Sequence, residues 1–348
     1  MVRKLKRLSL RLANDLGLSR LVLQSRWRRQ RLLILCYHGT AILDEHLWNP
    51  ELYATSRQLR RRLELIRQMG CNVLPLEEAL QRLYRKDLPP KSVVITYDDG
   101  GHDFYQQAYP ILQEFRMPAT VYLTTYYLTF NRPVYNLMVY YLLWKRAASS
   151  IQWPEVLGTS DRVELSEYGS AFVGRRMWQF PEENGLSGRE KDALLGTLAE
   201  KLAVDYAPVL HHRLFHIMSL AEAEELARAG VDFQLHTHRH RTPMQEDLFA
   251  QEIRDNRNLV DRIRRSPAAH FCYPSGLHQP AFLPWLRESK IASATTCETG
   301  LASARTEPLL LPRLVDTCRS TEYEFTAWLS GIAALLPRRS HTKGRYPL

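Results

Sequence analysis

The chain has 348 residues, 45% hydrophobic and 24% charged, which is typical of a globular protein with a substantial core. Its net charge is +10, but residues 1–31 hold ten Lys and Arg against the single acid Asp15, so the remainder is nearly neutral. This distribution, with no basic motif interleaved with aromatic residues, argues against a nucleic-acid-binding protein. The five cysteines are widely spaced without a C-x-x-C pair, which favours a reducing compartment over a disulfide framework.

Residues 1–31 form a basic N-terminal segment with an amphipathic pattern. A helix would place one stripe of leucines beside basic residues: Leu5, Leu8, Leu12 and Leu16. The apolar positions alternate with charges and no small-residue cleavage site follows, so we do not expect a secretory signal. We expect a cytoplasmic protein, peripheral on the inner membrane through its anionic surface. The alternative is a solvated helix packed on its own domain.

Short apolar runs alternate with helical patterns through residues 32–335. Such a succession predicts parallel strands with helical crossovers, and hence an α/β fold of the distorted (β/α) barrel type. Functional residues of such barrels lie at the carboxyl ends of the strands. The runs expected to be strands are LLILCYH, NVLPL, SVVITYDD, PATVYLTT, VDFQLHTH, AHFCYP, IASATTC and LLLPRL.

Residues 126–218 break this rhythm. The stretch VYNLMVYYLLW is too short to span a bilayer, and REKDALLGTLAEKLA has a helical pattern. We therefore predict a mostly helical insertion over one rim of the barrel, with a small independent domain as the alternative. Residues 336–348 form a polar C-terminal tail.

Two carboxylates, Asp98 and Asp99, follow the apolar run that begins at Val93. Adjacent acids repel each other, so one is commonly held ionised by a cation while the other acts as a base. Two histidines, His236 and His240, follow another strand. Their spacing of four would place both imidazoles on one side of a helical turn, where they can share a divalent metal. Without a metal, these sequences would be an ordinary acidic turn and a solvated histidine-rich turn.

Together these motifs resemble those of the polysaccharide deacetylases of carbohydrate esterase family four. TYDDG at residues 96–100 resembles the T-F-D-D-G motif of the family, and HTHRH at residues 236–240 resembles its H-[S/T]-x-x-H motif. YPILQEFRMPATVYL is similar to the segment that follows the first motif. The resemblance extends over residues 32–314 apart from the insertion.

The resemblance implies a role for each of these residues. Asp98 would be the catalytic base, and the metal, usually Zn²⁺, would be bound by Asp99, His236 and His240. A metal polarises an amide carbonyl and acidifies water, and a nearby carboxylate can accept the proton during attack.

The proton donor to the leaving amine is expected in an unusual place. Ordinary family members supply a His from a late L-x-H motif, but the only His after Leu310 is His341, in the polar tail. His38, which ends the first strand, resembles the catalytic His of the rearranged branch that includes biofilm poly-N-acetylglucosamine deacetylases. The first and last strands of a closed barrel are neighbours, so either can fill this position.

FCYPSG at residues 271–276 stands where the family has R-P-P-Y-G. Cys272 replaces the Arg that orients the base, and Arg313, in LLLPRL after the last strand, is the candidate substitute; a surface ion pair is its alternative role. By the resemblance, the N–H of Ser275 would help to hold the oxyanion. Tyr273 is expected to line the pocket, with a core tyrosine as the alternative.

The sequence therefore predicts a metal-dependent deacetylase, using Zn²⁺ or another divalent transition metal, that hydrolyses the N-acetyl group of an amino sugar. Its substrate would be a surface glycan or a lipid-linked sugar precursor. The alternatives are a deformylase of a lipid-linked formamido sugar and a non-catalytic glycan-binding subunit of a polysaccharide assembly complex.

Overall fold

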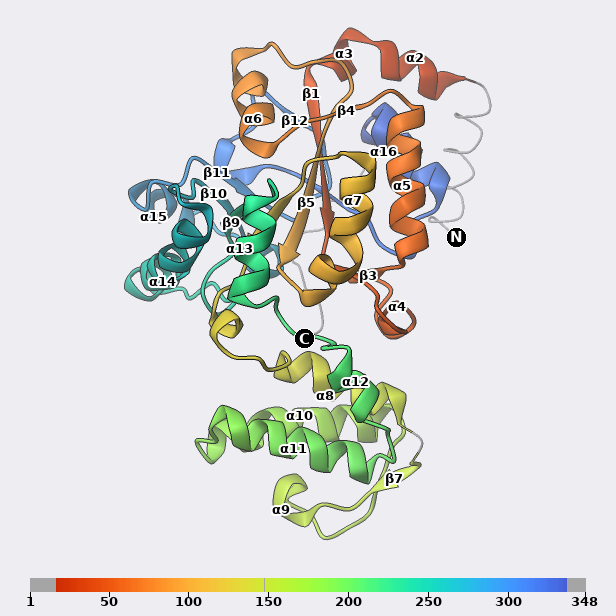
Figure 1. Ribbon diagram of the computed structural model, residues 1–348, viewed down its shortest axis with the longest axis vertical. Helices are drawn as coiled ribbons and strands as arrows, with labels where there is room; N and C mark the ends of the chain where they lie inside the picture. The colour runs from red at the N-terminus through yellow and green to blue at the C-terminus, as the bar shows by residue number, and fades with distance from the viewer. Residues whose placement is uncertain (1–16, 147, 337–348) are drawn as a thin grey trace. The chain divides into compact units, whose positions relative to one another are not determined.

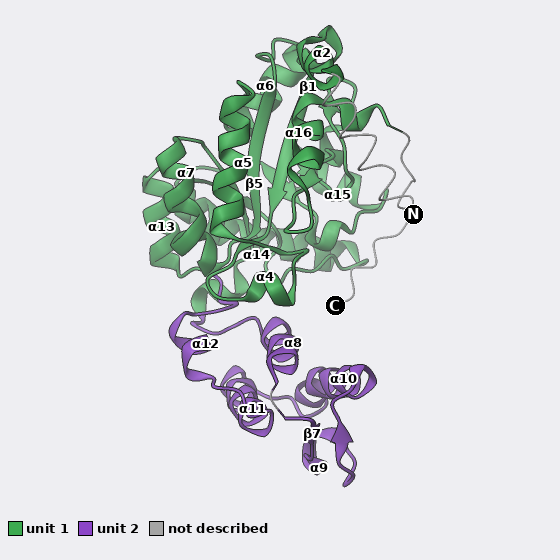
Figure 2. Ribbon diagram, turned by 90° about the vertical axis from the view of Figure 1, so that its right-hand side faces the viewer, with its two compact units in different colours: residues 1–129, 218–348 green, residues 130–217 purple. Residues whose placement is uncertain are grey.

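The computed structural model describes residues 17–146 and 148–336, which form two compact units (Figures 1 and 2). The first unit comprises the described parts of residues 1–129 and 218–348, and the second comprises residues 130–217. The predicted insertion, residues 126–218, contains the second unit. The stripe of leucines at residues 5–16, and residues 337–348 of the predicted tail, lie outside the described residues.

A nine-stranded sheet organises the first unit, in the order β11-β10-β9-β6-β5-β1-β12, with β13 also paired to β1 and β4 to β5. All of these pairings are parallel except that of β12 with β1. The strands are β1 (Arg31–Tyr37), β4 (Asn72–Val73), β5 (Ser92–Asp99), β6 (Thr120–Leu123), β9 (Asp232–Leu235), β10 (His270–Cys272), β11 (Ser293–Thr295), β12 (Ala302–Ser303) and β13 (Leu314–Val315).

The two edges of this sheet approach each other through residues 311–315. Leu311 forms a parallel bridge to Thr295 of β11, whereas Leu314 pairs with Leu35 of β1. The early and late parts of the chain are therefore neighbours, and the predicted α/β barrel-like fold is confirmed.

The central strands are hydrophobic because both of their faces are covered. In β5 every residue from Ser92 to Asp98 is buried, and in β1 every residue from Leu32 to Tyr37. Helices lie around the outside of the sheet (Figure 1). They are α2 (Leu18–Gln24), α3 (Arg26–Arg29), α4 (Glu45–Trp48), α5 (Ser56–Gln68), α6 (Leu76–Arg85), α7 (Tyr109–Phe115), α13 (Leu220–Arg228), α14 (Glu246–Arg264), α15 (Phe282–Glu288) and α16 (Glu322–Ser330).

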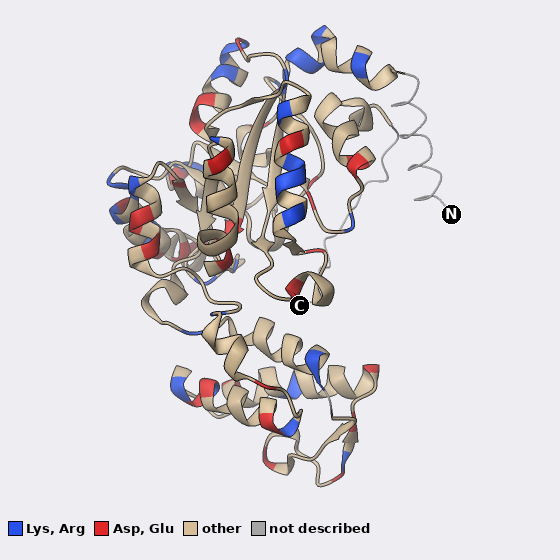
Figure 3. Cartoon of the chain, turned by 45° about the vertical axis from the view of Figure 1, so that its right-hand side comes forward, with Lys and Arg blue, Asp and Glu red and all other residues tan. Residues whose placement is uncertain are grey.

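Helices α2 and α3 belong to the first unit, although they fall within the predicted N-terminal segment. Their basic residues lie at one end of this unit (Figure 3). Arg28 is fully buried and its guanidinium donates to three backbone carbonyls, those of Arg31, Ser92 and Leu329. Arg28 therefore anchors this part of the predicted N-terminal segment to the first unit.

The second unit is mostly helical. Its core combines apolar side chains from three helices, among them Met138, Leu142, Met177 and Leu198. Its elements are α8 (Tyr135–Lys145), β7 (Ser150–Ile151), α9 (Pro154–Leu157), β8 (Val163–Glu164), α10 (Glu167–Glu183), α11 (Gly188–Lys201) and α12 (Ala207–His211). Among the described residues of the whole chain, no helix combines the length and apolar character needed to cross a membrane.

Candidate active site

The two adjacent acids lie at the carboxyl end of β5, where Asp98 pairs with Tyr122 and Asp99 with Leu123 of β6. The chain turns sharply after them, because Asp99 has a φ of 70° and Gly100 a φ of 81°. A Cβ on Gly100 would lie 2.2 Å from Cδ1 of Leu123, so both the backbone angle and the space demand glycine. Strain of this kind is common at functional sites.

Asp98 forms a buried, bidentate ion pair with Arg313. Nη1 and Nη2 of Arg313 each lie 2.7 Å from one oxygen of Asp98, and the two side chains are 0% and 2% exposed. Burial alone would raise the pKa of Asp98, but the charge and hydrogen bonds of Arg313 outweigh burial and hold that pKa well below its usual range. Asp98 is therefore an ionised carboxylate with a fixed orientation.

Arg313 lies within residues 311–315, the segment that links the sheet edges, and two further hydrogen bonds hold its side chain. Its Nε donates to the carbonyl of Thr296 (2.9 Å) and its Nη1 to the hydroxyl of Thr96 (3.2 Å). It lies directly before β13, not after the last strand as the sequence had indicated. The alternative of a surface ion pair is excluded by its burial.

Three further predicted residues converge beside this ion pair. Oδ1 of Asp99 lies 3.2 Å from Nε2 of His236 and 3.3 Å from Nε2 of His240. Nδ1 of His236 lies 2.8 Å from the carbonyl oxygen of Cys272 and must be the donor there, so in the neutral ring Nε2 carries a lone pair. Oδ1 of Asp99 is buried without a hydrogen-bond partner among the described residues. Lone pairs that converge in this way fit a divalent cation, and one carboxylate with two imidazoles is a ligand set for zinc.

The histidine loop differs from its prediction. Residues 236–240 do not form a helical turn; Thr237 and His240 instead adopt left-handed φ values of 62° and 53°. The irregular loop still brings the two imidazoles together, with ring centroids 4.9 Å apart. Spacing alone predicted the right contact through the wrong backbone geometry.

Two buried polar residues of α14 hold this loop, and the sequence analysis did not identify them. Glu252 accepts from the N–H of Arg239 (2.8 Å) and from the side chains of Arg239 and Arg241. Asn256 accepts from the N–H of His236 (2.9 Å) and donates to the carbonyl of Leu123 (2.9 Å). The two residues are four positions apart on the buried face of α14. Polar residues within an otherwise apolar helical stripe were the sequence signal that could have identified them.

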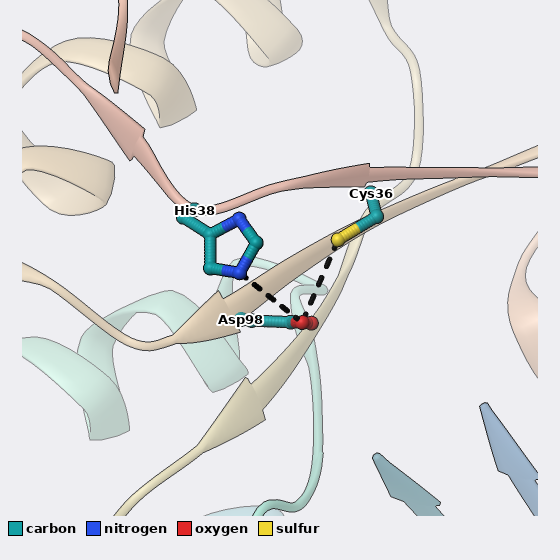
Figure 4. Close-up of side chains that lie close together, drawn as sticks. All are labelled: Cys36, His38 and Asp98. Carbon is teal, nitrogen blue, oxygen red and sulfur yellow. Dashed lines mark hydrogen bonds and ion pairs between the residues drawn. The ribbon is translucent and has the colours of Figure 1, made fainter. Parts of the chain in front are cut away.

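His38 follows β1 directly and points toward the same carboxylate (Figure 4). Its Nε2 lies 3.8 Å from Oδ2 of Asp98, and its side chain is 20% exposed. The next residues are tethered from the β5 side, because Oδ2 of Asp103 accepts from the N–H of Thr40 at 2.6 Å. The imidazole thus lies between solvent and the Asp98–Arg313 ion pair.

The loop after β10 differs from its prediction at Tyr273. Tyr273 is 0% exposed and its hydroxyl donates to the carbonyl of Leu309 (3.0 Å), so it is a core residue and does not line a pocket. Ser275 lies in a short turn of residues 274–276 with a left-handed φ of 55°. Cys272 approaches the ion pair, with Sγ 3.4 Å from Asp98 Oδ2 and 3.1 Å from Arg313 Nη2. His341 lies outside the described residues.

A family model described as "Polysaccharide deacetylase" matches residues 85–161, a stretch that includes the acidic doublet. The poly-beta-1,6-N-acetyl-D-glucosamine N-deacetylase of Escherichia coli is 29% identical over 101 residues, which are 28% of this chain and 15% of that protein. The protein of the same name from Staphylococcus aureus is 31% identical over 74 residues, 21% of this chain and 26% of that protein. The chain thus spans less than a third of the length of these curated relatives.

Two solved structures share the fold over most of the chain. The deacetylase PplD of Streptococcus pyogenes, solved in complex with acetate, has a TM-score of 0.56 at 20% identity and covers 88% of this chain and 99% of its own. IcaB from Ammonifex degensii has a TM-score of 0.53 at 17% identity and covers 86% of this chain and 97% of its own. At these identities the likeness establishes the fold.

Proposed function

Because the chain belongs to the polysaccharide deacetylase family, we propose that it is a metal-dependent hydrolase that removes the N-acetyl group from an amino sugar of a glycan. The observation that carries this proposal is the meeting of two sets of side chains at one end of the sheet. One set is Asp99 with His236 and His240; the other is the Asp98–Arg313 ion pair.

We assign the metal to Asp99, His236 and His240, and Zn²⁺ is the ion that this donor set suits best. A divalent cation there supplies Lewis-acid polarisation of the acyl carbonyl and of water. The protein fixes the donors in advance: His236 is oriented through its Nδ1–H, and the backbone of its loop is held by Glu252 and Asn256.

Asp98 is the proposed general base. The ion pair keeps it ionised and prevents it from rotating, so a carboxylate oxygen faces the site and can accept a proton from the attacking water. His38 is the proposed acid, which in its protonated form donates to the nitrogen of the leaving amine. The N–H of Ser275 is the proposed hydrogen-bond donor to the oxyanion.

The test is acetate release from N-acetylglucosamine oligomers by the purified chain. Removal of metal with a chelator should abolish the release, and one equivalent of Zn²⁺ should restore it. Asp98→Asn should lower the rate by about 10²–10⁴-fold without changing bound metal. Acetate release that survives complete metal removal would refute the mechanism.

The substrate we propose is an amino sugar in a surface polysaccharide or its lipid-linked precursor. The names of the Escherichia coli and Staphylococcus aureus relatives, which refer to a glucosamine polymer, support an N-acetylated glycan. A lipid-linked sugar would be met by a protein bound to anionic lipid through residues 1–31, and a cytoplasmic location at the inner membrane is part of this proposal.

A formamido sugar is the nearest alternative substrate. Mass spectrometry of sugar intermediates from a deletion strain separates the two, because deacetylation removes C2H2O whereas deformylation removes CO. A non-catalytic glycan-binding protein is the other alternative, and Cys272 in the position of the orienting Arg is an argument for it. The contact of Arg313 with Asp98 supplies that guanidinium from elsewhere, so this argument for a non-catalytic protein loses its force.

A further inference from the structure

A second group of potential metal ligands comprises Cys36, His38 and Asp98. Cys36 and His38 are two residues apart at the end of β1, and alternate residues of an extended chain point to the same side. Sγ of Cys36 lies 3.5 Å, and Nε2 of His38 3.8 Å, from Oδ2 of Asp98 (Figure 4). The three donor atoms all lie within 4.8 Å of one another.

We propose that Cys36, His38 and Asp98 form a second, sulfur-containing site for a thiophilic divalent cation, such as Zn²⁺ in excess or Cd²⁺. A cation there would occupy the proposed acid and base together and block hydrolysis. The binding claim is independent of the proposed function, and only the inhibition rests on it.

The spacing suits a tetrahedral ion. Bonds of about 2.3 Å to sulfur and about 2.0–2.1 Å to nitrogen or oxygen place neighbouring donors roughly 3.3–3.6 Å apart. The observed 3.5 Å between sulfur and oxygen lies in this range, and the 3.8 Å between nitrogen and oxygen requires only a small movement. His38 is partly exposed, so an ion can enter from the solvent side.

The ion pair with Arg313 does not prevent such binding. Oδ2 of Asp98 has two lone pairs, and one of them accepts from Nη2 of Arg313. The other is left to the weak S–H donors of Cys36 and Cys272, which a cation can displace. When the cation binds, Cys36 loses its S–H proton to the buffer and a metal–sulfur bond forms. The thiolate charge then offsets part of the charge of the cation beside Arg313.

The two sites differ in their donors, and this difference allows them to be observed separately. Asp99, His236 and His240 offer one oxygen and two nitrogens, whereas the second site includes a thiolate. Cd²⁺ bound to a thiolate gives a ligand-to-metal charge-transfer absorption in the ultraviolet, which carboxylate and imidazole ligands do not give. The band therefore reports the second site without any assay of hydrolysis.

The experiment titrates the metal-free full chain with Cd²⁺ and follows this band. The band should grow with the second equivalent, disappear in Cys36→Ser, and persist in the matched controls Cys71→Ser and Cys318→Ser. His38→Asn should weaken the second binding step by at least about 100-fold. Any of three results would overturn the proposed site. The band could be absent from the wild type, it could survive in Cys36→Ser, or it could be lost in Cys272→Ser instead.

A parallel measurement tests the inhibition. In the wild type, acetate release with excess Zn²⁺ should be at least tenfold slower than with one equivalent. In Cys36→Ser the two rates should be nearly equal, so that their ratio stays near unity. Equal ratios in the two proteins would overturn the inhibitory role. Absence of acetate release at one equivalent would refute the proposed function instead, while the Cd²⁺ band would still decide the binding claim.

Discussion

Replacement of Arg313 by Met removes one partner of a fully buried ion pair and leaves Asp98 buried without its cation. A buried pair that loses one partner typically costs 3–5 kcal/mol, because an uncompensated charge stays in the interior. We therefore expect Arg313→Met to lower the free energy of unfolding by about 4 kcal/mol at neutral pH.

The loss should depend on pH with a definite sign. In the wild type the pKa of Asp98 lies below its ordinary value of about 3.9, so its ionisation stabilises the fold above that pH and the contribution is lost as pH falls. In the variant, burial without Arg313 raises the pKa of Asp98, so stability falls as pH rises. The free energy of unfolding of the wild type should therefore exceed that of the variant by an amount that grows from pH 4 to pH 8, by at most about 1.4 kcal/mol per pH unit.

Urea unfolding of the metal-free proteins at several pH values measures this difference. Arg287→Met is the matched control, because Arg287 forms an exposed pair with Glu307 and should change stability by less than about 1 kcal/mol at any pH. The double variant Asp98→Asn/Arg313→Met should recover part of the loss and its pH dependence. A constant difference across this pH range, or equal losses in Arg313→Met and Arg287→Met, would contradict the charge argument.

Three other substitutions test how the site is built. His236→Gln should lower the affinity of the first metal by at least about 100-fold, measured by competition with a chelator, and unchanged affinity would remove His236 from the ligand set. Glu252→Gln should lower the affinity for that metal by about 10-fold, because the loop that carries His236 and His240 is held less firmly. Glu246→Gln on the same helix is the control. Burial raises the pKa of Asp103 to about 7, so the ionised form is penalised and stability is lost as pH rises toward neutrality. Asp103→Asn should therefore stabilise the fold by about 1–3 kcal/mol at pH 8 and by little at pH 4, as measured by urea unfolding, and an equal effect at both would contradict this reasoning.

Local patterns in the sequence were sufficient to predict the strand that ends in Asp98 and Asp99, and the meeting of the two histidines with Asp99. Each depends on short-range information: a buried apolar run that ends in acids, and two imidazoles in one short loop. Tyr273 could not be assigned in this way, because the partner of its hydroxyl is the distant carbonyl of Leu309. The hydrogen bonds of Arg28 to Ser92 and Leu329, which are distant in the sequence, could not be predicted from local patterns either.

Arg313 and His38 reach the site from opposite ends of the chain for one topological reason. Residues 311–315 link the edge at β11 to β1, and the pairing of Leu314 with Leu35 brings the residue before β13 close to the end of β1. The guanidinium of Arg313, which comes from residues 311–315, contacts both Asp98 and Cys272, and the small side chain of Cys272 leaves room for it. Because side chains alternate along a strand, a one-residue shift in the pairing of β13 with β1 would turn Arg313 away from Asp98. The register of this short pairing therefore determines whether Asp98, the proposed base, contacts Arg313. The guanidinium comes from residue 313 instead of residue 272, and the imidazole comes from residue 38 instead of a late L-x-H motif. Both departures from the common motifs follow from the pairing of β13 with β1.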